Sequence, residues 1–153
     1  MTSQPLDRAL VDLINLNHTS VIGYQEAAEA VHSPELKAQL SQFSQQRAGF
    51  ISTLERHAHQ HDLDVKNEST VESLATDAAA AVHRGWINVK SALTGHDDSA
   101  VLEAAKTGEA AALKAYETAL ATQGLPEDAK SVLQKQHGQI LEAKNWLEMH
   151  KVS

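Results

Sequence analysis

The chain has 153 residues and no cysteine, 42 % of its residues are hydrophobic, and its formal net charge is −7. This length and composition suit a single globular domain over residues 1–153, without disulfides or thiolate metal sites. The acidic balance argues against nucleic acid and anionic membranes, and no apolar run reaches the ~20 residues of a membrane span.

The first part of the chain is predicted to form a helical hairpin. Apolar residues recur in alternating steps of four and three over residues 6–31 and again over 34–61, which is the spacing of helices that pack in a bundle. Between them, Ser33 suits the helix cap, Pro34 the first helical position and Glu35 the positive end of the helix dipole. The predicted inward-facing positions are Leu10, Ile14, Asn17, Val21, Tyr24, Ala28 and Val31, then Leu36, Leu40, Phe43, Arg47, Phe50, Leu54, His57 and His61.

A long connection follows this hairpin. Residues 62–70 are polar and lack periodicity, which indicates a loop. Residues 71–93 regain the helical spacing and contain Trp86, with Gly85 as a potential kink. Gly95 is suited to cap the end of this helix. We therefore expect a helical crossover between the first hairpin and the rest of the chain.

A second hairpin is predicted from helices over 99–122 and 126–150, with Gly124, Leu125 and Pro126 forming the turn. Its inward-facing positions are Leu102, Ala105, Glu109, Ala112, Tyr116 and Ala119, then Leu133, Gln136, Ile140, Ala143 and Leu147.

The two hairpins look like copies of each other. Tyr24 and Tyr116 are 92 residues apart (116 − 24), and the same offset joins Asn17 to Glu109. It also joins Ala27 to Ala119, Pro34 to Pro126, Glu35 to Glu127 and Gln42 to Gln134. The sequence thus predicts an all-α four-helix bundle made of two helical hairpins.

Each bundle helix carries one polar residue in an otherwise apolar seam: Asn17, Arg47, Glu109 and Gln136. Counting residues from the two turns places all four within about one helical turn of the same level. We therefore expect them to meet in one central polar layer.

This arrangement resembles the ferritin-like superfamily, in which two helical hairpins are joined by a long crossover and carboxylates with Glu-x-x-His motifs bind two metal ions. More closely, the chain resembles a bacterial family of ferritin-like four-helix-bundle proteins of unknown function. The residues that carry this likeness are Gly23-Tyr24, His83-Arg84-Gly85-Trp86, Lys90-Ser91-Ala92-Leu93-Thr94-Gly95, Gly108-Glu109 and Ala115-Tyr116-Glu117. The resemblance covers nearly the whole chain and implies a fold without supplying an activity.

The chain departs from the metal-binding pattern at the ligand positions. Asn17 stands where the first carboxylate would be, and the levels expected for Glu-x-x-His carry Gln45, Gln46, Arg47 and Gly49, and then Gln136, His137, Gly138 and Leu141. Only Glu109 and His137 could still serve as ligands there. The sequence therefore predicts no metal in the centre, with iron or manganese as the alternative.

Three histidines, His57, His59 and His61, follow each other at every second position. On a helix His57 and His61 share a face, and such a pair can bind zinc or copper with help from Asp62 or Asp64. The alternative, which we favour, is a polar helix end whose cationic side chains lie near the negative end of the helix dipole.

The aromatic residues are predicted to be structural. The spacing of Trp86 favours packing on the bundle over contact with a ligand, and Tyr24 and Tyr116 are expected to donate hydrogen bonds to a neighbouring helix rather than to serve a metal. A carboxylate in an apolar seam needs a partner. We therefore predict a buried ion pair between Arg47 and Glu109, with further hydrogen bonds from Arg47 to Asn17 or Gln136.

Two functions remain open on the sequence alone. The favoured one is a non-catalytic helical bundle that serves as a binding or assembly module, in a bacterial stress response and in the cytoplasm. The stress role rests on the ferritin-like resemblance alone. The alternative is a metalloprotein that binds or oxidises iron or manganese at a degenerate site, with Glu109, His137, His57 and His61 as weak candidate ligands. We also expect a homodimer, because Trp86, Ile87 and Val89 give the crossover an apolar surface.

Overall fold

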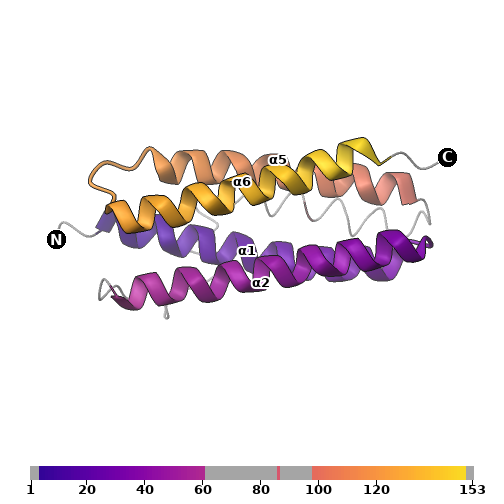
Figure 1. The fold of residues 1–153 in the computed structure, drawn as a ribbon, viewed down its shortest axis with the longest axis horizontal. Coiled ribbons are helices and arrows are strands. Elements are labelled where there is room, and N and C mark those ends of the chain that lie inside the picture. Colours follow the sequence, from indigo (N-terminus) through magenta and orange to yellow (C-terminus); the bar gives the residue numbers. More distant parts are fainter. Residues whose placement is uncertain (1–3, 61–85, 87–97, 151–153) are drawn as a thin grey trace.

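The structure, a computed structural model, describes residues 4–60, 86 and 98–150. Within these residues it contains four long α-helices and no strand: α1 (Gln4–Ala30), α2 (Pro34–Gln60), α5 (Asp98–Leu120) and α6 (Glu127–Met149). The helices lie side by side as a bundle (Figure 1). The prediction of an all-α chain with four long helices is confirmed for this part of the chain.

The α1–α2 hairpin is closed by the residues that its sequence predicts. The hydroxyl of Ser33 accepts a hydrogen bond from the backbone N–H of Leu36 at 3.3 Å, so Ser33 caps α2 ahead of Pro34. Lys37 donates from Nζ to the carbonyl oxygens of Ala28 at 3.1 Å and Glu29 at 3.3 Å, which supplies partners for the last turn of α1.

The α5–α6 hairpin turns through Gly124, whose φ of +78° lies in the region that side chains disfavour. α5 ends at Leu120, two residues before the predicted end, because the N–H of Thr122 donates to Ala119 O, three residues back, at 3.1 Å. α6 begins at Glu127 after Pro126, with Glu127 and Asp128 in its first turn.

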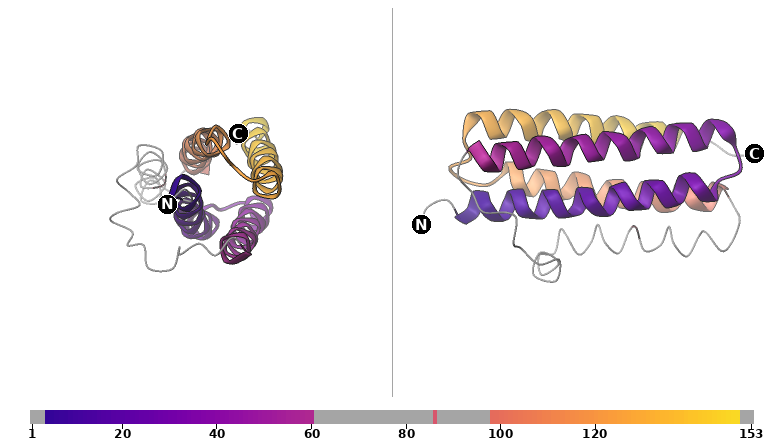
Figure 2. Two further views of the ribbon diagram at one scale, coloured as in Figure 1. Left: turned by 90° about the vertical axis from the view of Figure 1, so that its left-hand side faces the viewer. Right: turned by 90° about the horizontal axis from the view of Figure 1, so that it is seen from below.

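The order of the helices around the bundle follows from their contacts. α1 packs against α2 and α5, and α6 packs against α5 and α2. The four helices therefore form a ring in which α2 and α5 occupy diagonal corners, as the end-on view shows (Figure 2).

The direction of α5 is fixed by its first residue. The two carboxylate oxygens of Asp98 accept hydrogen bonds from the backbone N–H groups of His32 at 2.8 Å and Ser33 at 3.2 Å. α5 therefore begins at the end of the bundle where α1 turns into α2. α2 runs away from that turn for 27 residues, which is about 40 Å. The end of α2 and the start of α5 consequently lie at opposite ends of the bundle (Figure 1).

The core lies along the axis of the bundle and contains the predicted seams. Every predicted inward-facing residue from Leu10 to Leu54, and from Leu102 to Leu147, is buried apart from Val21, which is partly buried. His57 is partly exposed, and His61 lies outside the described residues. So do the predicted loop over 62–70 and the predicted helix over 71–93, with the exception of Trp86.

Candidate functional site

The polar interior of the bundle contains all four residues that interrupt the apolar seams. Asn17, Arg47 and Glu109 are fully buried, and Gln136 is almost so. Buried polar groups are tolerated only when they are hydrogen-bonded. The partners of these four side chains therefore define what the interior can do.

Arg47 on α2 and Glu109 on α5 form an ion pair across the diagonal of the bundle. Nη1 of Arg47 donates to Oε1 of Glu109 at 2.7 Å, and Nη2 donates to Oε2 at 2.5 Å. Both side chains have no exposed surface. The parallel pair of hydrogen bonds is the strongest geometry available to a guanidinium and a carboxylate.

Tyr24 on α1 completes the coordination of Glu109. Its hydroxyl donates to Oε2 at 2.5 Å, the oxygen that also receives Nη2 of Arg47. The guanidinium carbon lies 5.4 Å from the centre of the Tyr24 ring and 5.6 Å from that of Phe50, so two aromatic faces also surround the cation. Glu109 therefore has three donors from two other helices.

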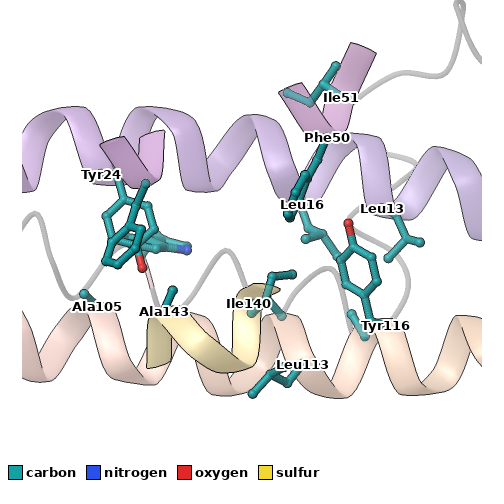
Figure 3. Close-up of a cluster of buried hydrophobic side chains, with 14 of the residues drawn as sticks. Leu13, Leu16, Tyr24, Phe50, Ile51, Ala105, Leu113, Tyr116, Ile140 and Ala143 are labelled. Atoms are coloured by element: carbon teal, nitrogen blue, oxygen red, sulfur yellow. The ribbon is translucent and has the colours of Figure 1, made fainter. Parts of the chain in front are cut away.

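A second group of hydrogen bonds lies next along the bundle. Asn17 donates from Nδ2 to Tyr116 Oη at 2.8 Å, and Tyr116 donates to Oε1 of Gln136 at 2.7 Å. Nε2 of Gln136 lies 3.5 Å from the carbonyl oxygen of Phe50. Figure 3 shows Tyr24 reaching from α1 towards α5 and Tyr116 reaching from α5 towards α1 at another point along the bundle. The tyrosines thus bond to neighbouring helices, as the sequence predicts.

The predicted further bonds of Arg47 to Asn17 or Gln136 are wrong. Nε of Arg47 donates instead to Oε1 of Gln46 at 3.0 Å, on its own helix. Asn17 and Gln136 are joined through Tyr116, because its phenol lies between them. Oδ1 of Asn17 is buried without a hydrogen-bond partner in the described part of the chain, although Nδ2 also donates to Leu13 O at 2.8 Å.

The electrostatics follow from burial and from this pairing. Burial raises the pKa of Tyr24 well above its ordinary value, and the charge of Glu109 raises it further, while Arg47 opposes the shift. Burial likewise raises the pKa of Tyr116. Burial acts to lower the pKa of Arg47, but the charge and hydrogen bonds of Glu109 outweigh it and raise that pKa. The phenols therefore stay protonated and the guanidinium stays charged.

The interior does not fit the di-metal centre that a ferritin-like fold would imply. Both oxygens of Glu109 already accept hydrogen bonds, and a guanidinium lies against them where a metal cation would need to be. Across the described parts of the chain, no group of three or more His, Asp and Glu side chains comes together to hold a metal ion.

The histidine candidates lie away from the centre. Nε2 of His137 is 3.2 Å from Oε2 of Glu117, on the partly exposed outer side of α5 and α6. His137 therefore does not lie beside Glu109, because the Glu109 side chain is buried in the interior whereas that of His137 is partly exposed and lies against Glu117. Nδ1 of His57 is 3.8 Å from Oδ2 of Asp128, near the start of α6. His61 lies outside the described residues.

Trp86 packs on the bundle, as the sequence predicts, but the sequence reasoning missed that it lies beside Tyr24 in a space left by two glycines. Trp86 is buried, with its ring centre 4.7 Å from that of Tyr24. A Cβ on Gly23 or on Gly108 would overlap its indole. The feature of the sequence that could have indicated this slot is a glycine inside each of two predicted helices. Glycine is unfavourable in a helix, so its presence there suggests that another side chain packs closely against the backbone.

The polar centre falls almost entirely within a known sequence family. A family model described as Domain of unknown function (DUF2383) matches residues 7–122, which include every central residue except Gln136. Comparisons with curated proteins and with solved structures gave no match. None of the described helices is long and apolar enough to cross a membrane.

Proposed function

The chain belongs to the family described as Domain of unknown function (DUF2383), and from that premise we propose that it is a non-catalytic, ferritin-like helical bundle that serves as a binding or assembly module. The proposal rests on the chemistry of the bundle centre. In that centre the buried carboxylate of Glu109 is paired with a guanidinium from the same chain.

The ferritin-like part of the proposal is supported by the arrangement of the helices. Two antiparallel hairpins pack side by side with α2 and α5 on diagonal corners. The end of α2 and the start of α5 lie at opposite ends of the bundle. A bundle of this topology needs one long connection, which is the feature of ferritin-like folds. The connection itself lies outside the described residues.

The single observation that carries the non-catalytic role is the state of Glu109. A catalytic carboxylate must offer an oxygen to a metal or to a reacting group. Here Oε1 and Oε2 receive Arg47 in a parallel pair and Tyr24 at 2.5 Å, all without exposed surface. In a di-metal bundle, metal ions from solution compensate the buried carboxylates. Here the guanidinium of Arg47 compensates Glu109 instead.

A metal assay tests this role against the metalloprotein alternative. The protein is produced with added iron and manganese, purified without chelator and analysed for bound metal. We expect far less than one equivalent per chain. The variants Glu109→Gln and His57→Ala locate any metal that is found. Stoichiometric iron or manganese that is lost in Glu109→Gln and kept in His57→Ala would establish a central site and overturn the proposal.

The partner that we propose for the module is a second copy of the same chain, with which it forms a homodimer. Trp86 no longer supports it, because its side chain is buried within the chain. The support is instead two separate exposed apolar side chains, Ile22 on α1 at 55 % and Leu141 on α6 at 42 %, each of which a subunit contact would cover. Light scattering over a range of concentrations should show a dimer that Ile22→Lys or Leu141→Lys weakens. A monomer at the highest concentration would remove this part of the proposal.

The proposal includes the cytoplasmic location and the role in a bacterial stress response that the ferritin-like resemblance suggests. Cell fractionation tests the location. Growth of a deletion strain under excess iron and under peroxide tests the stress role. Growth equal to that of the parent strain under both conditions would contradict it.

A further inference from the structure

Trp86 occupies a slot that two helices of the bundle leave open. An ideal Cβ on Gly23 of α1 would lie 2.5 Å from Cδ2 of Trp86, and one on Gly108 of α5 would lie 2.7 Å from Cε2. Real Cβ atoms do not approach other atoms so closely. The indole therefore fits only because both helices carry glycine at this level.

The slot adjoins the ion pair in sequence and in space. Gly23 directly precedes Tyr24, and Gly108 directly precedes Glu109, so each glycine is the chain neighbour of one of the two residues that share the 2.5 Å hydrogen bond. The Trp86 ring contacts the Tyr24 ring at 4.7 Å with its plane inclined by 64°. Phe43 of α2 contacts the same ring at 5.3 Å. The ring of Tyr24 is thus in contact with two aromatic side chains.

The fit of Trp86 is one of shape and apolar contact rather than of hydrogen bonding. Nε1 of Trp86 is buried and has no hydrogen-bond partner among the residues that the structure describes. A buried donor without an acceptor is unfavourable, so apolar contacts must hold the indole in place. The same contacts keep water away from Tyr24, whose side chain has no exposed surface.

We propose that Trp86 is a positioning residue for the buried centre: seated between Gly23 and Gly108, it holds the phenol of Tyr24 against Glu109 and excludes water from the Tyr24–Glu109–Arg47 cluster. Trp86, which lies between the two hairpins in the sequence, is thereby coupled to the ion pair through Tyr24. This role is separate from the proposed module function and is tested by separate measurements.

The primary test follows the ionisation of Tyr24 alone. The chain has two tyrosines, so Tyr116→Phe leaves Tyr24 as the only phenol, and absorbance near 295 nm reports its ionisation. Far-ultraviolet circular dichroism at each pH shows whether the bundle is still folded. In Trp86→Ala with Tyr116→Phe, we expect the midpoint to fall by about one pH unit or more while the helices persist. An unchanged midpoint in the folded variant would overturn the proposal.

Two further measurements separate positioning from general stability. Trp86→Phe keeps an aromatic ring and removes the unpaired N–H, so it should restore most of the Tyr24 midpoint. Added indole should bind the space left in Trp86→Ala, raise its melting temperature and restore the midpoint, with no effect on the unmodified chain. A midpoint that neither Trp86→Phe nor indole raises would mean that the indole does not position Tyr24.

A second route keeps the test open if Trp86→Ala does not fold. Gly108→Ala blocks the slot without deleting the indole, and Gly138→Ala is the matched control, since a Cβ there meets nothing within 4 Å. In a Trp146→Phe background Trp86 is the only tryptophan. We expect Gly108→Ala to expose Trp86 to acrylamide quenching and to lower the Tyr24 midpoint, and Gly138→Ala to do neither. A buried Trp86 and an unchanged midpoint in Gly108→Ala would contradict the proposal.

Discussion

Tyr24 on α1 donates to Glu109 on α5 at 2.5 Å, and one level along the bundle this relationship is reversed. There Asn17 on α1 donates to Tyr116 on α5 at 2.8 Å. Tyr24 corresponds to Tyr116, and Asn17 to Glu109, by the 92-residue offset between the hairpins. Each tyrosine therefore bonds to the residue that lies seven positions before its counterpart. The two hairpins are therefore joined by two hydrogen bonds between equivalent positions. The one from Tyr24 ends on the charged Glu109, whereas the one between Asn17 and Tyr116 joins two neutral side chains.

The ion pair should behave as a unit in unfolding. We expect Arg47→Leu and Glu109→Leu each to lower the free energy of unfolding by about 3–5 kcal/mol, because each leaves a buried charge without its partner. The double variant should lose much less than the sum, since two apolar side chains then replace the pair. Urea midpoints of the four proteins measure the coupling. Effects that simply add would show that the two residues are independent.

The surface pair of Lys144 and Glu148 on α6 is the control for this cycle. Nζ of Lys144 lies 2.5 Å from Oε2 of Glu148, yet Glu148 is exposed to solvent. Exposed pairs contribute little because water and salt screen them. We expect no measurable coupling between Lys144→Ala and Glu148→Ala. Coupling as strong as that of the buried pair would mean that distance, not burial, determines the effect.

Stability should fall at alkaline pH because both tyrosines are held protonated in the native state. The pKa values of Tyr24 and Tyr116 are raised by burial. Above about pH 10 the unfolded chain releases these protons while the native chain keeps them, so the free energy of unfolding falls by up to about 1.4 kcal/mol per pH unit for each tyrosine. Below that pH neither phenol contributes a slope.

Urea unfolding at several values between pH 8 and 11 measures this slope. Tyr24→Phe and Tyr116→Phe should each remove one share of it, and the double variant should remove both. All four proteins contain the same lysines, whose contribution therefore cancels in the comparison. A slope that is equal in the unmodified protein and in the double variant would show that the tyrosines do not cause it.

Two helical glycines should be replaceable with a gain in stability. A Cβ on Gly49 of α2 or on Gly138 of α6 would meet nothing within 4 Å. Alanine restricts the unfolded chain and favours a helix, so we expect each of Gly49→Ala and Gly138→Ala to add about 0.5–1 kcal/mol to the free energy of unfolding. Thermal unfolding checks this. A loss of stability in either variant would contradict the prediction and would mean that the glycine at that position is required for the folded structure.

Asp98 should fix the start of α5 to the α1–α2 turn. Its buried carboxylate accepts two backbone N–H groups, from His32 and Ser33. Asp98→Ala leaves both donors without this partner, and we expect a loss of about 1–3 kcal/mol. Hydrogen exchange at His32 and Ser33 should accelerate with it. Glu103→Ala on the exposed side of α5 is the control, and equal losses in the two variants would contradict the role of Asp98.

The sequence alone predicted the four helices, their seams and the four polar residues that interrupt those seams, although it expected one polar layer where the structure has two successive groups. Alternating steps of four and three define which face of a helix is buried, and this rule depends only on the helical repeat. This spacing placed Arg47 and Glu109 inside the core. Because an unpaired buried charge is energetically unfavourable, the sequence then predicted that the two residues form an ion pair. These inferences succeeded because periodicity and the need for charge compensation are local or pairwise properties.

Only the tertiary structure decided which partners the remaining polar groups take. Counting residues along helices fixes heights to about one turn, whereas hydrogen bonds are made or lost over a few tenths of an ångström. The sequence therefore could not tell that Arg47 would turn back to Gln46, or that Tyr116 would lie between Asn17 and Gln136. The sequence could not predict the slot for Trp86 either. Gly23 and Gly108 lie 85 positions apart (108 − 23), and they form one surface only when α1 packs on α5.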